Sequence, residues 1–346
     1  MEKISLSICI PTYNRANNLI NCLESLYANE KKYLDQITVC ISDNCSTDNT
    51  KKVVSKYLDK LPIIYSKNKT NLGIPKNFLK VVSMSNAEYV WLVGDDDLFL
   101  ENSIERVLNL ISKNKDIDFF YVNSYHLDTE YVDSFSQPFD VKNIPKNMEK
   151  FSKWNFNGKI KFFDLIRPEV SFDFLGGMFL SVFRKSNWDD FRDVLDEKAI
   201  ESKDTFSHFD NTFPHVKIFA SAFSNSIAYF NSNPMNICLT GAREWAPMEP
   251  LVRNIRLIEA LDAYKKNGLP TLQYFLCRNF ALSNFIPGFI YMLLNKEISG
   301  YRYIENPLKK IIFNMVYPNF YLSVLRFIIR KLRLRLNKIF NKEELR

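Results

Sequence analysis

The sequence predicts an α/β protein with a mostly parallel sheet and a helical C-terminal region. Strand-like and helix-like segments alternate four times over roughly the first 125 residues. The segment at residues 89–93 is apolar at every position, which is typical of a central strand buried on both faces. From Glu249 onward the apolar residues recur at helical spacing. Repeated strand–helix units of this kind build a parallel sheet with right-handed crossovers.

Each element of the first half follows from the spacing of its apolar residues. A period of two, as in Leu6, Ile8 and Ile10, predicts a strand. Helical spacing, as in Leu19 and Cys22, predicts a helix. Strands are expected at residues 4–10, 36–42, 61–65, 89–93 and 117–125. Helices are expected at residues 15–28, 50–60, 74–84 and 103–111.

The pattern becomes less regular beyond residue 130. Residues 130–160 are polar and aromatic with single proline and glycine breaks, which predicts a long loop or lid. Further on, a strand is expected at residues 227–230 and helices at 251–266 and 274–294. We therefore expect one domain at residues 1–240, with halves at 1–125 and 126–240, and a helical region with a basic amphipathic tail at residues 241–346.

The net charge of +7 is concentrated at the C-terminus. From Arg302 to Arg346, eleven Lys and Arg residues stand against three acids, and the rest of the chain is nearly neutral. Because these basic residues alternate with Phe, Ile and Leu, the tail suits an anionic membrane surface. A nucleic-acid partner is not expected, since such proteins carry their charge on the folded face that contacts the backbone. The alternative is a C-terminal helix packed on the body with its charges in water.

The same composition bears on where the protein is found. No window reaches 18 clean apolar residues, so an orthodox membrane span is not expected. The first residues, MEKISLSICIPTYNR, do not resemble a signal peptide, and the six cysteines contain no C-x-x-C pair. The expectation is a cytoplasmic protein with reduced cysteines, peripheral at the inner face of the cytoplasmic membrane.

Polar residues follow each of the first four predicted strands. In a parallel sheet, ligands bind at the carboxyl ends of the strands, so these residues are the candidate site. They are Pro11–Arg15, Asp43–Asn44, Asn71–Gly73 and Gly94–Asp97. The sequence contains neither G-x-G-x-x-G nor G-x-x-x-x-G-K-[ST], which excludes a dinucleotide-binding Rossmann domain and a P-loop NTPase.

Three adjacent acids, Asp95, Asp96 and Asp97, close the fourth strand. Their mutual repulsion is offset by a divalent cation, and Mg²⁺ or Mn²⁺ takes carboxylate oxygens together with substrate phosphates. The alternative is a solvated turn or a helix cap. Asp43 likewise has two interpretations, because it can accept hydrogen bonds from a ribose or base, or belong to an Asx turn before the next helix.

Four segments together resemble a known family. They are ICIPTYNR, ISDNCSTDNT, NLGIPKNF and YVWLVGDDD, in this order and at this spacing over roughly the first 125 residues. They resemble the nucleotide-binding half of family-2 glycosyltransferases with the GT-A fold, and the GDDD form resembles bacterial O-antigen transferases of the abequosyltransferase type. The resemblance implies an enzyme that uses Mn²⁺ or Mg²⁺ and moves one sugar, with inversion, from a nucleotide-sugar donor. The implied acceptor is a lipid-linked, undecaprenyl-type glycan in the synthesis of O-antigen or another surface polysaccharide.

The resemblance also implies roles for individual residues. Asp97 matches the acid that holds the metal ion against the diphosphate, and Asp95 matches the acid that contacts the ribose or sugar and shares the metal. The remaining donor contacts are implied for Pro11, Thr12, Tyr13, Arg15, Asp43, Asn71, Gly73, Asn77 and Asp96.

In the acceptor half, Gly176 and Gly177 match a glycine pair that precedes the catalytic base. Asp210 is the candidate base, with Asp204 as the runner-up and Glu201 as a weaker third. The alternative for Asp210 is an ordinary helix cap.

Two further pairs of residues have open roles. His208 and His215 are either contacts to metal or phosphate, or structural histidines. Arg243, as a diphosphate contact, and Trp245, on the acceptor side, lie where relatives have a mobile loop. The alternative is a surface Arg beside a packed Trp.

Two other functions remain open at this point. A sugar-phosphate nucleotidyltransferase shares the α/β plan, but the Gly-rich loop and Arg–Lys signature of that class are absent. A non-catalytic membrane-surface protein would depend on the basic tail alone.

Overall fold

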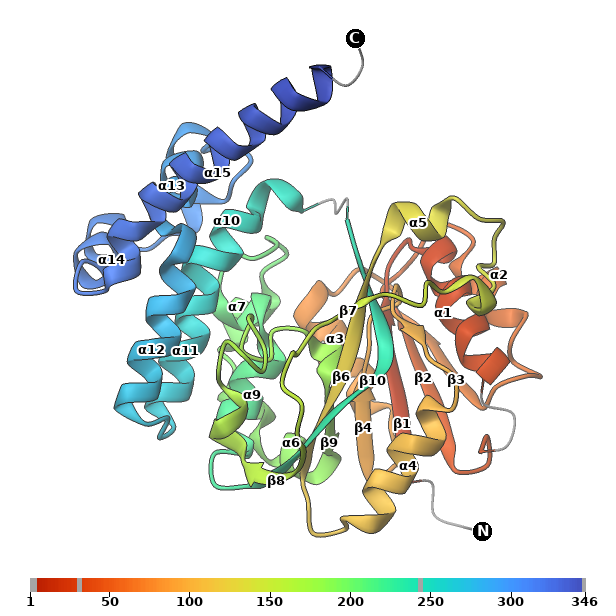
Figure 1. Cartoon of the computed structure of the whole chain (residues 1–346). Helices are drawn as coiled ribbons and strands as arrows, with labels where there is room; N and C mark the ends of the chain where they lie inside the picture. The colour runs from red at the N-terminus through yellow and green to blue at the C-terminus, as the bar shows by residue number, and fades with distance from the viewer. Residues whose placement is uncertain (1–4, 30–32, 242–244, 344–346) are drawn as a thin grey trace. The chain divides into compact units, whose positions relative to one another are not determined.

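The structure is a computed structural model that describes residues 5–29, 33–241 and 245–343 (Figure 1). The chain divides into two compact units. The first comprises residues 1–205 and 210–243, and the second comprises residues 206–209 and 244–346.

A single mixed sheet forms the centre of the first unit. Its strand order among the described residues is β3-β2-β1-β4-β9-β6-β10-β5, with β7 paired to β6 and β8 paired to β10. The strands are β1 (Leu6–Thr12), β2 (Ile37–Asp43), β3 (Ile63–Lys67), β4 (Tyr89–Leu92), β5 (Leu98–Phe99), β6 (Phe119–Asp128), β7 (Glu149–Lys150), β8 (Asn157–Lys161), β9 (Ser181–Arg184) and β10 (Ile227–Thr240).

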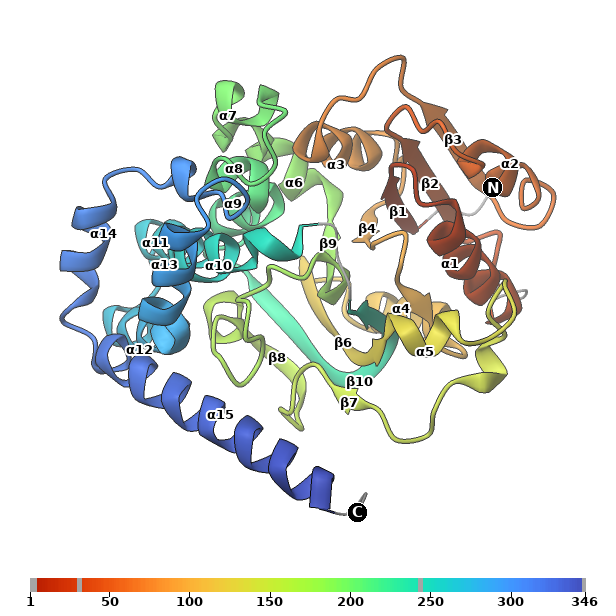
Figure 2. The same cartoon turned by 90° about the horizontal axis from the view of Figure 1, so that it is seen from above.

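Helices cover both faces of this sheet. They are α1 (Ala16–Asn29), α2 (Thr50–Ser55), α3 (Ile74–Ser83), α4 (Ser103–Lys113), α5 (Thr129–Asp133), α6 (Lys185–Phe191), α7 (Glu197–Glu201), α8 (Phe209–Thr212) and α9 (Pro214–Ala222). Figure 2 shows α1 and α4 on one face and α3, α6 and α9 on the other. Strands β1, β2 and β4 are buried at every position, as their apolar sequences predict.

The predicted order of strands and helices in the first half is confirmed. The sheet also contains a strand that the sequence did not predict, because β9 lies between β4 and β6 and is antiparallel to both. The helix predicted at residues 50–60 is also shorter and ends at Ser55. Its last residues form turns before Pro62, which forces the preceding residue into an extended conformation.

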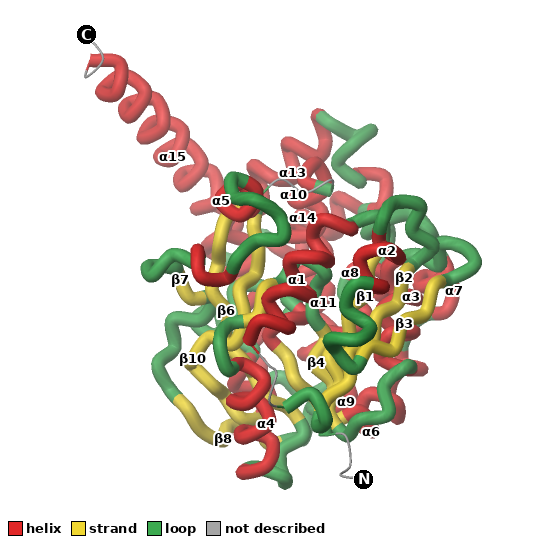
Figure 3. Tube along the Cα trace, turned by 90° about the vertical axis from the view of Figure 1, so that its right-hand side faces the viewer, coloured by secondary structure: helices red, strands yellow, loops and turns green. Residues whose placement is uncertain are grey.

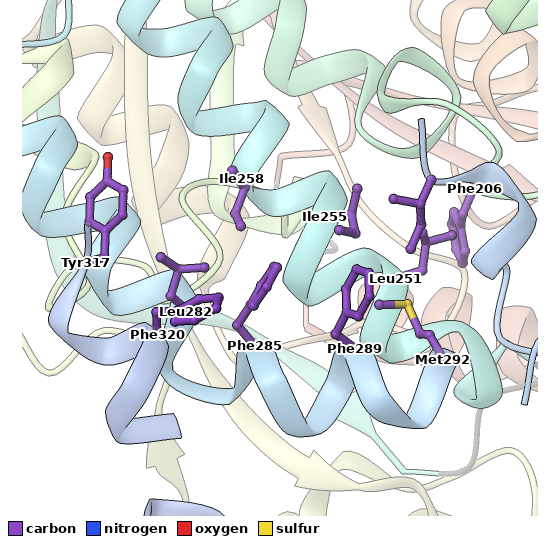
Figure 4. Close-up of a cluster of buried hydrophobic side chains, with 11 residues drawn as sticks. Phe206, Leu251, Ile255, Ile258, Leu282, Phe285, Phe289, Met292, Tyr317 and Phe320 are labelled. Atoms are coloured by element: carbon purple, nitrogen blue, oxygen red, sulfur yellow. The ribbon is translucent and has the colours of Figure 1, made fainter. Parts of the chain in front are cut away.

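The second unit is a helical bundle around its own core. Its helices are α10 (Glu249–Leu251), a π-helical segment (Val252–Arg256), α11 (Leu257–Lys266), α12 (Thr271–Ala281), α13 (Phe285–Leu294), α14 (Pro307–Asn314) and α15 (Pro318–Glu343). The core combines Leu251 and Ile255 with Phe285 and Phe289 of α13 (Figure 4). These residues lie on the faces that the helical spacing predicts.

The long helix predicted at residues 274–294 is interrupted. A short 3₁₀ segment at Leu282–Asn284 separates α12 from α13. Pro287 stands in the first turn of α13, where a missing N–H is tolerated, whereas it would break a continuous helix.

The basic tail begins inside the bundle and then becomes exposed. Tyr317 and Phe320 are buried in the core of the second unit. Figure 3 shows the later turns of α15 projecting past α13. Among the described helices, none alone has the length and apolar character of a membrane span. α14 and residues 318–333 meet that criterion only as a pair, and the two are bent by 98°.

Candidate active site

The carboxyl ends of β1 and β2 are joined into one surface by side-chain hydrogen bonds. Thr12 and Asp43 are paired in register at the ends of these strands. Asn14 has a left-handed backbone (φ 53°), and its Oδ1 accepts a hydrogen bond of 2.7 Å from the Thr47 N–H. The Asn14 N–H in turn donates to Ser46 Oγ at 2.8 Å. The two loops therefore hold each other in place.

The two acids of the second loop have different roles. Asp43 is fully buried, and its carboxylate accepts hydrogen bonds from the Ser46 N–H (2.7 Å) and the Tyr65 hydroxyl (2.6 Å). Asp48 accepts hydrogen bonds from the backbone N–H of Ala16 (2.9 Å) and Thr50 (3.0 Å). Asp48 therefore caps the starts of α1 and α2, which leaves Asp43 as the acid at the end of β2.

Asn44 connects β2 to the start of α3, a role that sequence reasoning missed. Its Nδ2 donates to Asn71 Oδ1 at 2.8 Å, and its Oδ1 accepts from the Leu72 N–H at 2.8 Å. Asn71 Oδ1 also accepts from the N–H of Gly73, whose φ of 82° suits glycine. The buried Asn77 donates to the carbonyl of Ser42 at 3.0 Å. The position of Asn44 directly after Asp43 is the signal that points to it.

The acidic turn after β4 contacts the loop after β1. Asp95 is buried, and its Oδ2 accepts a hydrogen bond of 2.7 Å from the Thr12 hydroxyl. Arg15 lies 3.4 Å from Asp95 and 2.8 Å from Asp96. Burial raises the pKa of Asp95 to about 7, although Arg15 opposes this, and Asp96 adds to the rise.

Asp97 is directed into the turn itself. Its Oδ2 accepts a hydrogen bond of 2.6 Å from the Gly94 N–H. A Cβ at Gly94 would lie 2.6 Å from Asp96 Oδ1 and 3.2 Å from Asp97 Oδ2, so only glycine fits there with this arrangement of acids. The GDDD sequence therefore makes a compact turn that packs three carboxylates together.

The donor atoms of this turn fit a hard divalent cation only in part. Asp95, Asp96 and Asp97 offer carboxylate oxygens, and a cation would reduce the cost of ionising the buried Asp95. Within the described ranges, however, no group of three or more His, Cys, Asp or Glu side chains is arranged to hold a metal ion. A cation there would need further oxygens from substrate phosphates, as Mg²⁺ does in phosphate sites.

β9 brings the glycine pair to the carboxyl ends of the parallel strands. Val182 pairs with Trp91 of β4 in an antiparallel register, so the residues before β9 lie near the carboxyl end of β4. Both glycines have close neighbours where a side chain would begin. A Cβ at Gly176 would lie 3.0 Å from the Asp173 carbonyl oxygen, and one at Gly177 would lie 2.9 Å from the ring of Phe179.

His215 is hydrogen-bonded to the segment that contains the glycine pair. It is buried, and its Nε2 donates to the carbonyl of Gly176 at 3.0 Å. Its Nδ1 has no hydrogen-bond partner among the described residues. Burial lowers the pKa of His215 to about 4, although the bond to Gly176 opposes this, so the ring is neutral at physiological pH.

We expect His215 to make the protein sensitive to acid. The unfolded chain binds a proton at this side chain between about pH 6.5 and pH 4, and the folded chain does not, so stability falls as the pH is lowered through that range. The loss is on the order of 3 kcal/mol. Urea unfolding at pH 7 and pH 4.5 measures it, with His215→Gln as the comparison. An equal loss of stability in the two proteins would contradict the prediction.

The carboxylates considered for the base lie in different environments. Asp210 is fully buried, and its Oδ2 accepts from Lys217 Nζ (2.5 Å) and from the Asp196 N–H (2.6 Å). Asp204 is exposed, and Glu201 forms an exposed ion pair of 3.1 Å with Lys76. Of these three carboxylates, Asp210 is thus the one that is buried, and it forms an ion pair with Lys217.

The remaining predicted residues are placed as follows. Pro11 is buried and Tyr13 is 43% exposed at the end of β1. His208 is half-buried in the second unit. Trp245 packs edge-on against Phe206 in the same unit, with ring centres 5.3 Å apart. Arg243 lies outside the described residues.

Comparison with known proteins places the chain among glycosyltransferases. It is 29% identical over 237 residues to the abequosyltransferase RfbV of Salmonella typhimurium, a match that covers 67% of this chain and 66% of RfbV. It is 26% identical over 178 residues to the glycosyltransferase GlyG of Streptococcus pneumoniae, covering 48% of this chain and 57% of GlyG. The chain thus spans less than two thirds of the length of these curated relatives.

Solved structures show the same fold. Residues 1–349 of S. aureus TarS, in complex with UDP, match with a TM-score of 0.52 at 16% identity, covering 82% of this chain and 72% of that one. The mannosyltransferase PcManGT of Pyrobaculum calidifontis, in complex with GDP-Man and Mn²⁺, matches with a TM-score of 0.52 at 11% identity, covering 94% and 87%. These similarities confirm the predicted GT-A fold.

The family model described as glycosyl transferase family 2 matches residues 7–184. This range contains β2, β4 and all of β1 except Leu6, together with the polar strand ends, the acidic turn and the glycine pair. Because the match covers more than half of the chain, the protein belongs to glycosyl transferase family 2.

Proposed function

We propose that this protein transfers one sugar from a nucleotide-sugar donor to a hydroxyl group of a lipid-linked glycan, in the synthesis of O-antigen or a related surface polysaccharide. The observation that carries the proposal is the buried Asp95, held by Thr12 and facing Arg15, where the ends of β1 and β4 meet. Relatives named abequosyltransferase and glycosyltransferase support sugar transfer. Neighbours in complex with UDP or GDP-Man support a nucleotide-sugar donor.

The donor would lie across the carboxyl ends of β1, β2 and β4. Tyr13, exposed at the end of β1, offers an aromatic face to the base, and Asp43 offers a carboxylate to the base or ribose. The network of Asn44, Asn71 and Gly73 would hold the backbone beneath the nucleotide. These side chains bind and orient the donor, and they take no part in bond breaking.

Asp95 and Asp97, together with Asp96, would hold Mn²⁺ or Mg²⁺ when the donor is bound. A divalent ion at this position would neutralise charge on the departing diphosphate. Arg15 already pairs with Asp95 and Asp96, and its guanidinium would exchange a carboxylate for a phosphate oxygen of similar geometry when the donor binds.

Asp210 is our proposed general base. Its carboxylate forms an ion pair of 2.5 Å with Lys217, and a carboxylate oxygen would accept the proton of the acceptor hydroxyl. The acceptor oxygen then attacks the anomeric carbon while the bond to the diphosphate breaks, which inverts that carbon. Because Asp210 is fully buried here, the proposal requires its oxygen to be uncovered in the complex with the acceptor.

Donor binding tests this function directly. With Mn²⁺ present, the cognate member of a panel of UDP-, GDP-, CDP- and dTDP-sugars is expected to raise the melting temperature, because a ligand that binds only the folded state stabilises it. The other nucleotides serve as the control for nonspecific anion effects. Absence of a shift with every donor, with and without Mn²⁺, would contradict the proposal.

We also propose that the helical unit binds an anionic membrane surface, where a lipid-linked acceptor would be met. Large apolar side chains on and between its last helices are exposed, including Leu294 (77%), Leu308 (75%) and Val316 (70%). Exposed basic residues accompany them, namely Lys309, Arg326, Arg330, Lys331 and Arg333. Apolar and basic groups together are what a surface of anionic lipid binds.

Removing charge from α15 is therefore expected to weaken membrane binding. Replacing Arg326, Arg330 and Arg333 with Gln should lower partitioning onto phosphatidylglycerol vesicles by about tenfold or more, since each charge near the surface contributes about 1 kcal/mol. Co-sedimentation measures this. The matched control replaces Lys51, Lys52 and Lys56, which are exposed on and just after α2, and should bind like the wild type. Equal losses in the two variants would refute a specific role for α15.

A further inference from the structure

A cavity of about 620 Å³ lies in the first unit, apart from the polar strand ends described above. It is formed where the segment after β6 folds back on that strand, with β7 paired to β6 through Glu149 and His126. Its walls include His126, Glu149, Phe151, Trp154, Glu169 and Phe172. Nothing in the donor site or in the proposed mechanism uses these residues.

The apolar wall of this cavity is a cluster of three rings. Phe151 contacts His126 and Phe172, with ring centres 4.9 Å and 4.7 Å away and planes inclined by 30° and 21°, and the rings of His126 and Phe172 lie 6.4 Å apart. Phe172 keeps 38% of its surface exposed. Trp154 is anchored edge-on against Phe230 at 5.2 Å. Rings fixed in this way present flat apolar faces at low entropic cost.

The polar part of the wall is balanced in charge. Two carboxylates, Glu149 and Glu169, are accompanied by two ammonium groups, Lys150 and Lys153. Glu149 pairs with Lys153 at 2.8 Å, and both remain largely exposed. Such a set offers hydrogen-bond acceptors and donors without a net field, which suits a neutral ligand with many hydroxyl groups better than a phosphate.

The cavity is connected to the strand that carries the acidic turn. Phe151 contacts Phe179 edge-on, with ring centres 5.6 Å apart. The carbonyl of Phe179 accepts a hydrogen bond of 2.8 Å from the indole N–H of Trp91 in β4. Phe172 stands four residues before Gly176 in the chain, so the ring wall leads directly into the glycine pair.

From these observations we infer that the cavity is a carbohydrate subsite that binds a pyranose ring of the acceptor glycan. The ring faces would contact the C–H face of the sugar, while Glu149, Glu169 and Lys153 would bind its hydroxyl groups. That the sugar belongs to the acceptor rests on the proposed transferase function. The subsite itself requires only that a neutral sugar binds.

The test uses the full chain and defined probes. Methyl glycosides of mannose, galactose, rhamnose and glucose are examined by saturation-transfer NMR, without donor or metal. At least one is expected to show transfer to its C–H protons, and Phe172→Ala and Trp154→Ala should weaken its binding about tenfold. Phe172→Tyr keeps an aromatic face and should retain binding. Phe191→Ala, which removes a ring of similar exposure (39%) on α6, is the control.

Each outcome decides the matter. Absence of transfer from every glycoside, or binding that Phe172→Ala and Trp154→Ala leave unchanged, overturns the inference. The proposed function is examined separately, through the donor-induced shift in melting temperature of the wild-type protein. A protein that binds donors but no glycoside in this cavity therefore loses the subsite alone, and one that binds glycosides there but no donor loses the proposed transferase function.

Discussion

Asp95→Asn is expected to lower the rate of sugar transfer by about 10²–10³-fold. The substitution keeps the shape of the side chain and an oxygen that accepts the hydrogen bond from the Thr12 hydroxyl. It removes the negative charge that the Asp95 carboxylate contributes to the acidic turn. A neutral amide at this position binds a divalent cation poorly and leaves the charge on the leaving diphosphate without compensation. Turnover of the cognate donor with and without Mn²⁺, together with the donor-induced thermal shift, measures the effect.

Asp116→Asn is the matched control for this prediction. Asp116 lies just before the amino end of β6, away from the acidic turn at the carboxyl end of β4. It forms an exposed ion pair of 2.7 Å with Lys159. The same change of one carboxylate to an amide should leave transfer within about twofold of the wild type, because an exposed pair contributes little. If Asp95→Asn retained metal-dependent donor binding and turnover, the catalytic interpretation of the acidic turn would be wrong.

The spacing of apolar residues could predict where this site lies, because it determines which residues follow each strand. It could not predict which polar atoms of these residues form hydrogen bonds within the protein. Asp43 and Asp97 both follow buried strands, yet Asp43 bonds Ser46 and Tyr65, and Asp97 bonds the N–H of Gly94. Those contacts depend on loop conformation, which local periodicity does not encode.

Long-range pairing limits the prediction in a second way. β9 has only four residues, and its partners Trp91 and Phe120 lie far away in the sequence. No local pattern indicates that such a segment will separate β4 from β6, so the sequence favoured a more uniformly parallel sheet. In the sequence the glycine pair is identified only by resemblance to the family, and its placement beside β4 depends on this strand.

Burial of a charged helical residue is equally hard to predict. A basic residue within a helix normally remains in water, but Arg256 has only 4% of its side chain exposed. It ends the π-helical segment, whose wider turn shifts the register of the side chains that follow. Its guanidinium donates to the carbonyls of Phe206 (3.0 Å), Ser207 (2.6 Å) and Tyr303 (3.0 Å).

Arg256→Ala is therefore expected to destabilise the second unit by about 3–5 kcal/mol. The substitution leaves three carbonyl groups without their donor and breaks the 2.7 Å ion pair with Glu259, which then keeps only Lys310. Hydrogen–deuterium exchange of the full chain measures the effect, and amides at residues 251–266 should exchange about a hundredfold faster or more. Arg253→Ala is the control, because Arg253 is 60% exposed and forms a surface ion pair of 2.7 Å with Glu249. That variant should lose less than about 0.5 kcal/mol. Similar protection in the two variants would mean that the buried guanidinium contributes no more than a surface charge, and that the apolar core alone holds this unit together.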